Sequence, residues 1–195
     1  MGGKKSLIKV GKTPPTLSPQ KRFLRDISKH ADKRSGMSNK LVEKLARGFC
    51  SKNFHGVFAA DSIPIRKLAG RPRFIIILNL ARERPGPLFS FDGHFVVVYA
   101  TPNSIRYFDP YGLPCTQPDV RSFLSQCQRP IRQNRQQIQD KKSVYCGMFC
   151  LLFAAFNDRK DSSNPPRFKM SFFKKREKLK LNDTKCMQYL RKLVK

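Results

Sequence analysis

The sequence predicts an α+β domain in which a mixed sheet is flanked by helices, with basic extensions at both ends. Two observations predict this class. Short segments rich in branched and aromatic residues, which are typical of strands, occupy residues 74–80, 94–100 and 104–109. Helical patterns precede and follow these runs, and a chain of 195 residues can bury one sizeable core. We therefore expect a single folded domain.

The first helix is expected to open this domain. Ser38 or Asn39 can cap a helix that runs to about Arg47, and Gly48 is its expected stop. Because apolar residues recur there at helical spacing, one face of the helix should be buried. The residues expected on this face are Leu41, Val42 and Leu45.

The strands follow the helix. Residues 74–80 are apolar except for Asn79, which is typical of a strand buried on both faces. Residues 94–100 and 104–109 are expected to pair as an antiparallel hairpin, since a turn-forming segment separates them. This hairpin places His94 and Asp109 at the same end of the two strands, about 5 Å apart. A hydrogen bond between an imidazole and a carboxylate is therefore within reach.

Three further helices are expected after the hairpin. Residues 119–127 have an amphipathic pattern, residues 148–156 form an apolar run typical of a buried helix, and residues 183–194 are a C-terminal candidate. His30 and His55 lack partners for ligation or catalysis and are expected in loops. The side chains expected to point inward from the first of these helices are Val120, Phe123 and Leu124.

The charge distribution predicts an anionic partner. Forty Lys and Arg against thirteen Asp and Glu give a net charge of +27, so non-specific nucleic-acid binding is expected. Residues 1–37 read as a basic, flexible N-terminal arm, and the folded domain of residues 38–195 has a basic C-terminal region from about residue 159. Polyanion binding at these ends is expected to be separable from chemistry in the middle. Residues 168–176 alternate aromatic and cationic side chains, which suits phosphate contact and base stacking, although a nuclear address fits residues 174–178 equally well.

The cysteines and the apolar runs of the sequence indicate where the protein is expected to be located. Six cysteines without a Cys-x-x-Cys pair, and no secretory leader, favour a reducing, intracellular location. The cysteine spacings are irregular, so no metal site is expected. The apolar runs are too short to cross a bilayer, and the one membrane signal is a myristoylation pattern at Gly2. We expect a monomer.

Four residues in the order His94, Asp109, Gln139 and Cys146 predict a thiol-dependent active site. Cys146 opens the apolar run, His94 would act as its base and Asp109 would orient the imidazole ring. The Gln139 amide and the backbone N–H of Cys146 would stabilise the oxyanion of a tetrahedral intermediate. Gly147 is expected to let the substrate approach closely.

Two positive groups can stabilise the thiolate at this site, the imidazolium of His94 and the N-terminus of the following helix. A free thiol is mostly protonated at neutral pH, so the nucleophilic thiolate needs a positive neighbour. An imidazolium about 4 Å from the sulfur supplies about 4 kcal/mol at an effective dielectric constant of 20, whereas a helix N-terminus supplies up to about 2 kcal/mol. We therefore expect His94 to contribute more than the helix that begins near Cys146.

The motifs Gly-His94, Phe-Asp109-Pro-Tyr-Gly and Gln139-x6-Cys146-Gly resemble those of adenain, the adenovirus-type cysteine endopeptidase, over about residues 40–156. The resemblance implies a papain-like fold and a His-Asp-Cys enzyme that cleaves viral precursor proteins during virion maturation. It also implies a location in the host nucleus and virion, with DNA and a short activating peptide as cofactors. Cys127 lies near the family's peptide-linking cysteine, one residue out of register. The family usually has Glu where this chain has Asp109, so the carboxylate reach is one methylene shorter.

Two alternatives remain open from the sequence. A ubiquitin- or SUMO-conjugate protease of related fold uses the same order of His, Asp, Gln and Cys. A basic DNA-packaging protein could carry the same residues as an inert thiol site. The first alternative differs in substrate, and the second differs in the reactivity of the thiol.

Overall fold

The computed structural model describes most of the predicted domain. The described residues are 25, 36–81, 93–158, 168–174 and 178–193. The predicted N-terminal arm, apart from Arg25, Gly36 and Met37, lies outside them, as does the myristoylation pattern at Gly2. Met37, at the end of that arm, is buried and belongs to the hydrophobic core.

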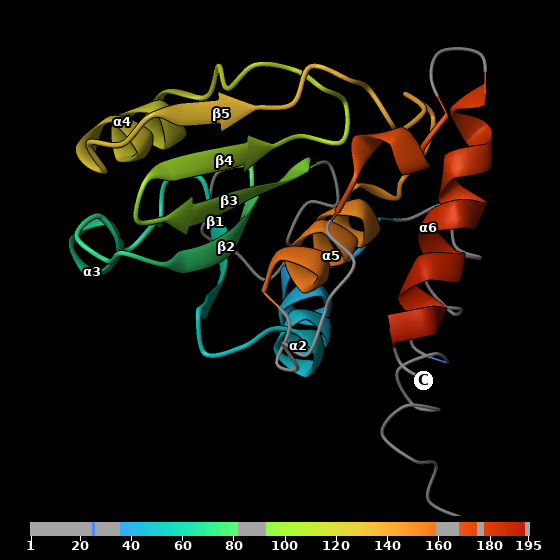
Figure 1. The fold of residues 1–195 in the computed structure, drawn as a ribbon, viewed down its shortest axis with the longest axis horizontal. Helices are drawn as coiled ribbons and strands as arrows, with labels where there is room; N and C mark the ends of the chain where they lie inside the picture. Colours follow the sequence, from blue (N-terminus) through green and yellow to red (C-terminus); the bar gives the residue numbers. More distant parts are fainter. Residues whose placement is uncertain (1–24, 26–35, 82–92, 159–167, 175–177, 194–195) are drawn as a thin grey trace, which may run out of the picture.

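A five-stranded mixed sheet forms the centre of the fold (Figure 1). Its spatial order follows the sequence. β1 runs parallel to β2, β3 is antiparallel to both β2 and β4, and β5 runs parallel to β4. The predicted α+β class with a mixed sheet flanked by helices is confirmed. The strands are β1 (Phe54–Ala59), β2 (Phe74–Asn79), β3 (Phe95–Thr101), β4 (Ser104–Phe108) and β5 (Ile131–Gln133).

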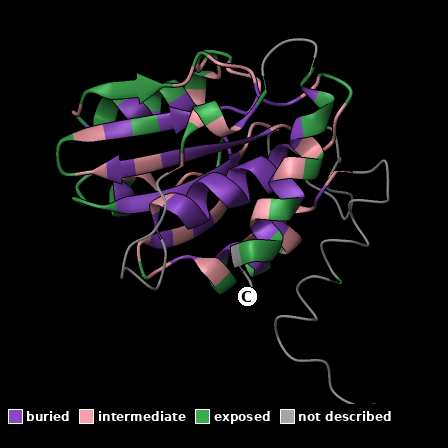
Figure 2. Cartoon of the chain, turned by 45° about the vertical axis from the view of Figure 1, so that its right-hand side comes forward, coloured by how far each residue is buried: buried purple, intermediate pink, exposed green. Residues whose placement is uncertain are grey.

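Helices cover both faces of this sheet and create two cores. One face packs against α2 (Asn39–Phe49) and α5 (Cys146–Asn157), with α6 (Lys180–Leu193) and the short 3-10 helix η1 (Met170–Phe172) on the outer side. The other face packs against α3 (Ile65–Leu68) and α4 (Pro118–Gln126). α5 therefore lies between the sheet and α6, which explains why it is buried along almost its whole length (Figure 2).

Most of the predicted elements are confirmed. β2 and the β3–β4 hairpin occupy the predicted runs, and Ser38 caps α2 by accepting a hydrogen bond from the N–H of Leu41 at 3.3 Å. α4 buries the three predicted side chains, and the apolar run after Cys146 is the buried helix α5. No helix in the described parts of the chain combines the length and the apolar character needed to span a membrane.

Some helix boundaries differ from the prediction, and two strands, β1 and β5, were not predicted. α2 continues through Gly48 to Phe49, because the N–H of Cys50 still bonds to the carbonyl of Ala46. The buried face of α2 holds Ala46, while Leu41 is half-buried. His55 lies in β1 and not in a loop; a register irregularity at Gly56, whose φ is +139°, interrupts the alternation that identifies strands.

Candidate active site

Cys146 is the first residue of α5. Its backbone N–H and that of Gly147 belong to the first helical turn, where N–H groups have no partner within the helix. The positive end of the helix dipole is therefore directed at the position of the Cys146 side chain. The helix begins here because Tyr145 leaves the helical conformation and eleven consecutive buried residues follow it.

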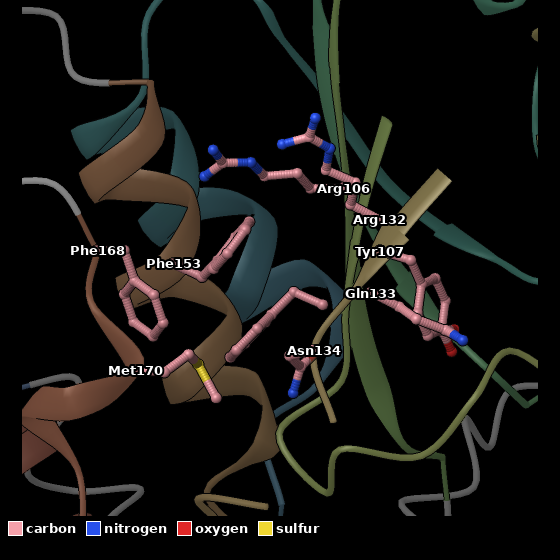
Figure 3. A pocket seen from close by; sticks show the side chains of 9 residues that line it. Arg106, Tyr107, Arg132, Gln133, Asn134, Phe153, Phe168 and Met170 are labelled. Atoms are coloured by element: carbon pink, nitrogen blue, oxygen red, sulfur yellow. The ribbon is translucent and has the colours of Figure 1, made fainter. Parts of the chain in front are cut away.

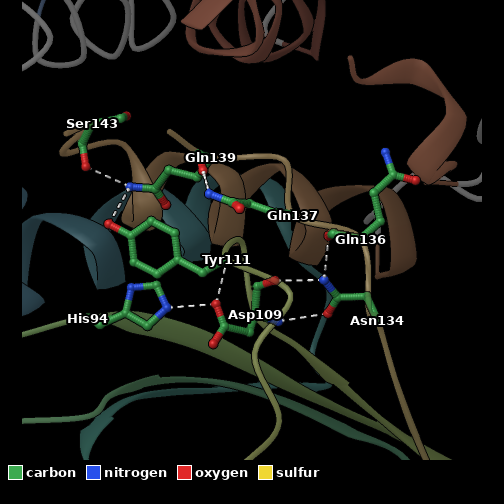
Figure 4. Close-up of polar contacts among 8 residues, drawn as sticks. All are labelled: His94, Asp109, Tyr111, Asn134, Gln136, Gln137, Gln139 and Ser143. Carbon is green, nitrogen blue, oxygen red and sulfur yellow. Dashed lines mark hydrogen bonds and ion pairs between the residues drawn. The ribbon is translucent and has the colours of Figure 1, made fainter. Parts of the chain in front are cut away.

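His94 and Asp109 meet at the end of the hairpin, with His94 Nε2 lying 2.8 Å from Asp109 Oδ1 (Figure 4). The register pairs Val97 with Phe108, so the two residues are diagonal neighbours beyond the last pair and not directly opposite. Their side chains are nevertheless long enough to form the hydrogen bond. The shorter reach of Asp109 compared with glutamate is sufficient for this contact.

Tyr111 and Asn134 make three further hydrogen bonds to the buried Asp109. Its Oδ1 accepts a hydrogen bond from the N–H of Tyr111 at 2.7 Å. The Asn134 side chain accepts from the N–H of Asp109 at 2.9 Å and donates to its carbonyl at 2.6 Å (Figure 4). The φ of Gly112 is +68°, and a Cβ there would lie 2.7 Å from the backbone of Gln136, so this turn requires glycine. The carboxylate therefore has a fixed position.

The charge state of His94 follows from its neighbours. Burial alone would lower its pKa, but hydrogen bonds to Asp109 and Cys146, together with the negative charges of both, raise the pKa from 6.5 to about 9. The ring is then protonated at neutral pH, and Nε2–H donates to Asp109. Since Asp109 takes Nε2, the nitrogen left for the Cys146 side chain is Nδ1. The arrangement favours an imidazolium beside the sulfur.

Gln139 is fully buried, and its amide group already has partners. Nε2 donates to the carbonyl of Ser143 at 2.8 Å and to the hydroxyl of Tyr111 at 3.4 Å, while Oε1 is buried without a hydrogen-bond partner among the described residues (Figure 4). The Ser143 carbonyl fixes this orientation of the amide, because only the nitrogen can donate to it. Donation to an oxyanion therefore requires the longer contact with Tyr111 to open.

Gly147 faces protein, which corrects the expected role of this residue in substrate approach. A Cβ at Gly147 would lie 3.2 Å from Val42 Cγ2 and 3.3 Å from Met37 Sδ. The missing side chain therefore lets the first turn of α5 pack closely on α2 and on the segment before it.

A pocket of about 290 Å³ lies in front of the reactive groups. His94, Cys146 and Tyr111 line one part of it, and the Tyr111 ring stacks on the His94 ring at 4.5 Å between centroids. The residues completing the lining are Gly36, Met37, Gly93, Phe95, Ser143 and Val144. A substrate group entering this pocket would meet the thiol and the imidazole together.

Cys127 lies on the opposite side of the sheet from this pocket. It follows α4, is buried in the core that α3 and α4 cover, and burial raises the pKa of its thiol. All six cysteines are free. In the described ranges there is no group of three or more His, Cys, Asp or Glu side chains that could hold a metal ion.

The aromatic residues of the C-terminal region pack mainly inward. Rings that pack inward are not available for the predicted stacking on bases. Phe173 is buried, and the Phe172 ring stacks on Tyr189 at 5.6 Å. Phe168 is half-buried and contacts the rings of Phe153 and Phe108. Of the three, Phe168 also lines a surface hollow, which is described below.

Sequence reasoning missed two residues of the site. Tyr111 contacts His94, Asp109 and Gln139, and its signal was its place directly after the Asp-Pro pair. Asn134 holds both backbone groups of Asp109 from 25 residues away, and nothing in its local sequence indicates this contact.

Comparisons with known proteins give little further information. No family model matches the chain, and neither does any curated protein. Among solved structures, one of "AvrA delL154 with IP6, CoA" is similar at 18% identity with a TM-score of 0.36, covering 72% of this chain. This chain spans about half (51%) of that protein. A likeness at this level carries no argument about activity.

Proposed function

We propose that this chain is a cysteine peptidase in which Cys146 is the nucleophile. The observation that carries the proposal is the 2.8 Å contact between His94 and Asp109, beside a pocket that Cys146 also lines at the start of a buried helix. A buried carboxylate, a protonated imidazole and a thiol at a helix N-terminus are the groups that thiol-dependent acyl transfer needs.

The reaction follows from these positions. The Cys146 sulfur anion adds to the scissile carbonyl carbon, and the backbone N–H of Cys146, with an N–H of Gln139, stabilises the oxyanion. Collapse breaks the C–N bond while His94 gives its proton to the leaving amine. The remaining thioester is hydrolysed by a water molecule that gives a proton to His94, which restores the starting state. Asp109 keeps the ring in place throughout.

The finer assignment is a papain-like endopeptidase of adenain type that cleaves viral precursor proteins. It rests on the sequence motifs around His94, Asp109 and Gln139 and on the mixed sheet flanked by helices. The net charge of +27 supports nucleic acid as a partner that concentrates enzyme and substrate. A disulfide between Cys127 and an activating peptide belongs to the same proposal; Cys127 is largely buried but lines a surface hollow with Gly70 and Arg129, and the peptide would approach the thiol through this hollow.

Peptide cleavage by variants tests the nucleophile. Cys146→Ala should lower turnover of a cleaved library peptide by at least about 10³-fold, because the covalent step is lost. Cys115→Ala is the matched control, since Cys115 is the one cysteine of the six that is not buried and lies outside the pocket. Retained turnover in the Cys146 variant would reject the assignment. A panel of ubiquitin-like conjugates and viral precursor fragments separates the endopeptidase from the conjugate-specific alternative.

Thiol reactivity distinguishes an enzyme from an inert DNA-packaging protein. Cys146 should react with iodoacetamide at neutral pH much faster than Cys115, since burial raises the pKa of the Cys115 thiol. His94→Ala should bring the Cys146 rate down to that of an ordinary thiol. Equal rates at the two cysteines in the unaltered chain would contradict the proposal.

A further inference from the structure

A second hollow, of about 180 Å³, lies on the α5 side of the sheet and does not include Cys146 (Figure 3). Phe153, which lines it, is seven residues after Cys146 on α5, or about 10 Å further along the helix axis. β4 and β5 form one wall, and Phe168 and Met170 lie across from them. The hollow shares no lining residue with the pocket at Cys146, although Asn134, which holds the backbone of Asp109, lies in its wall.

Two arginines stand at one rim of this hollow. Arg106 of β4 and Arg132 of β5 are paired in register, so their Cα atoms face each other across parallel strands about 4.8 Å apart. Both are exposed, and within the described residues neither side chain has an ion pair or hydrogen bond. Like charges directly opposite each other destabilise a sheet. A bound anion would remove this cost, and paired guanidinium groups suit the oxygens of a phosphate.

The interior of the hollow is apolar and aromatic. The Phe153 ring stacks on Phe108 at 4.3 Å between centroids, and the Phe168 ring meets both at steep angles. No acidic residue lines the hollow. Its volume suits one planar group next to the arginines, and aromatic side chains are the surfaces on which unpaired bases stack.

We propose that this hollow binds one nucleotide of a single-stranded nucleic acid, with a phosphate on Arg106 and Arg132 and the base against Phe153 and Phe168. A base in a duplex is not free to enter, so the site selects single strands. The net charge of +27 favours a polyanion, and a phosphate polymer supplies both a negative charge and a base at every unit. The inference rests on the proposed nucleic-acid contact and is independent of peptidase activity.

Fluorescence anisotropy with a labelled thymidylate 12-mer tests the site, using the full chain. Arg106→Gln together with Arg132→Gln should weaken binding about tenfold and make the log–log salt dependence shallower by about 1. The matched control is Arg66→Gln with Lys67→Gln, which removes the same charge from exposed residues of α3 beneath the other face of the sheet. This control should change affinity less than threefold, and a uridylate 12-mer should give the same pattern.

Phe168→Leu tests the stacking part. It should weaken single-strand binding at least about fivefold while leaving the affinity for a duplex of equal length unchanged. Equal losses from the rim and control pairs, or equal effects of the Phe168 variant on both nucleic acids, would overturn the proposal. It would also be overturned if an acidic peptide containing phenylalanine bound in a manner that depends on Arg106 and Arg132 while the 12-mer did not. A chain that binds no oligonucleotide at all would remove the nucleic-acid contact itself and leave the peptidase proposal standing.

Discussion

The pKa of His94 is a direct consequence of its two partners and can be measured without a substrate. Burial lowers the pKa, while Asp109 and Cys146 raise it, and the result is about 9 instead of 6.5. Asp109→Asn removes one negative charge at 2.8 Å and should lower the pKa by more than one unit. Combining it with Cys146→Ala removes both partners. Burial then acts alone, and the pKa should fall below 6.5.

Proton NMR of the histidine ring hydrogens is the assay. The chain has three histidines. The resonances that disappear in the single variants His30→Gln and His55→Gln belong to those residues, and the third resonance belongs to His94. His55 is an internal reference in which burial, followed by the charge of Arg71, lowers the pKa. A His94 pKa that stays within half a unit of the starting value in the Asp109 variant would refute the reasoning, as would one above 6.5 in the double variant.

The same shift predicts how stability depends on pH. Because the folded-state pKa of His94 is raised, its stabilising contribution is complete below pH 6.5 and is lost as the pH rises through 9. At 1.36 kcal/mol per pKa unit, a rise from 6.5 to about 9 corresponds to about 3 kcal/mol. Urea unfolding at pH 6 and pH 10 should therefore show this extra loss in the unaltered chain and not in the double variant.

Two further substitutions test how the site is supported. Asn134→Leu leaves the backbone N–H of Asp109 unpaired, while the carbonyl of Asp109 keeps its hydrogen bond from the N–H of Gly112. Urea unfolding should therefore show a loss of about 1–3 kcal/mol, and NMR titration should show a lower pKa for His94. An unchanged pKa would show that Asn134 does not position the carboxylate. Gly93→Ala would place a Cβ 1.8 Å from Asn79 Oδ1 and should cost about 1–3 kcal/mol in thermal unfolding as Asn79 loses its hydrogen bonds. Gly48→Ala is the control, since nothing lies within 4 Å of its Cβ and stability should rise by up to about 1 kcal/mol; equal losses in both would contradict the packing argument.

The elements that sequence could predict are those specified by local pattern. The eleven buried residues of α5 form an uninterrupted apolar run, and the β3–β4 hairpin is closed by a turn of adjacent residues. β1 is different, because it pairs in parallel with a strand 20 residues later and carries a register irregularity at Gly56. Its stabilising contacts are long-range, so no local alternation identifies it.

In the candidate site too, local pattern specifies some features and long-range contacts specify others. His94, Asp109 and Cys146 could be recognised in the sequence, because a hairpin positions the first two and the start of a helix positions the third. The orientation of the Gln139 amide could not be predicted from the sequence, since its partners Tyr111 and Ser143 belong to different loops and meet only in the folded chain. A motif thus identifies the residue types of a site, whereas tertiary contacts decide which hydrogen bonds those residues make.

The C-terminal helix joins the basic region to the candidate site, although the charge distribution had suggested that the two were separable. Asn182 of α6 is fully buried and donates to the carbonyl of Ile138, the residue before Gln139. Asp183 hydrogen-bonds the side chain of Ser143, whose carbonyl holds the Gln139 amide. α6 therefore fixes the loop on both sides of the proposed oxyanion donor. A polyanion bound along the exposed face of α6 would act on the helix that positions Gln139.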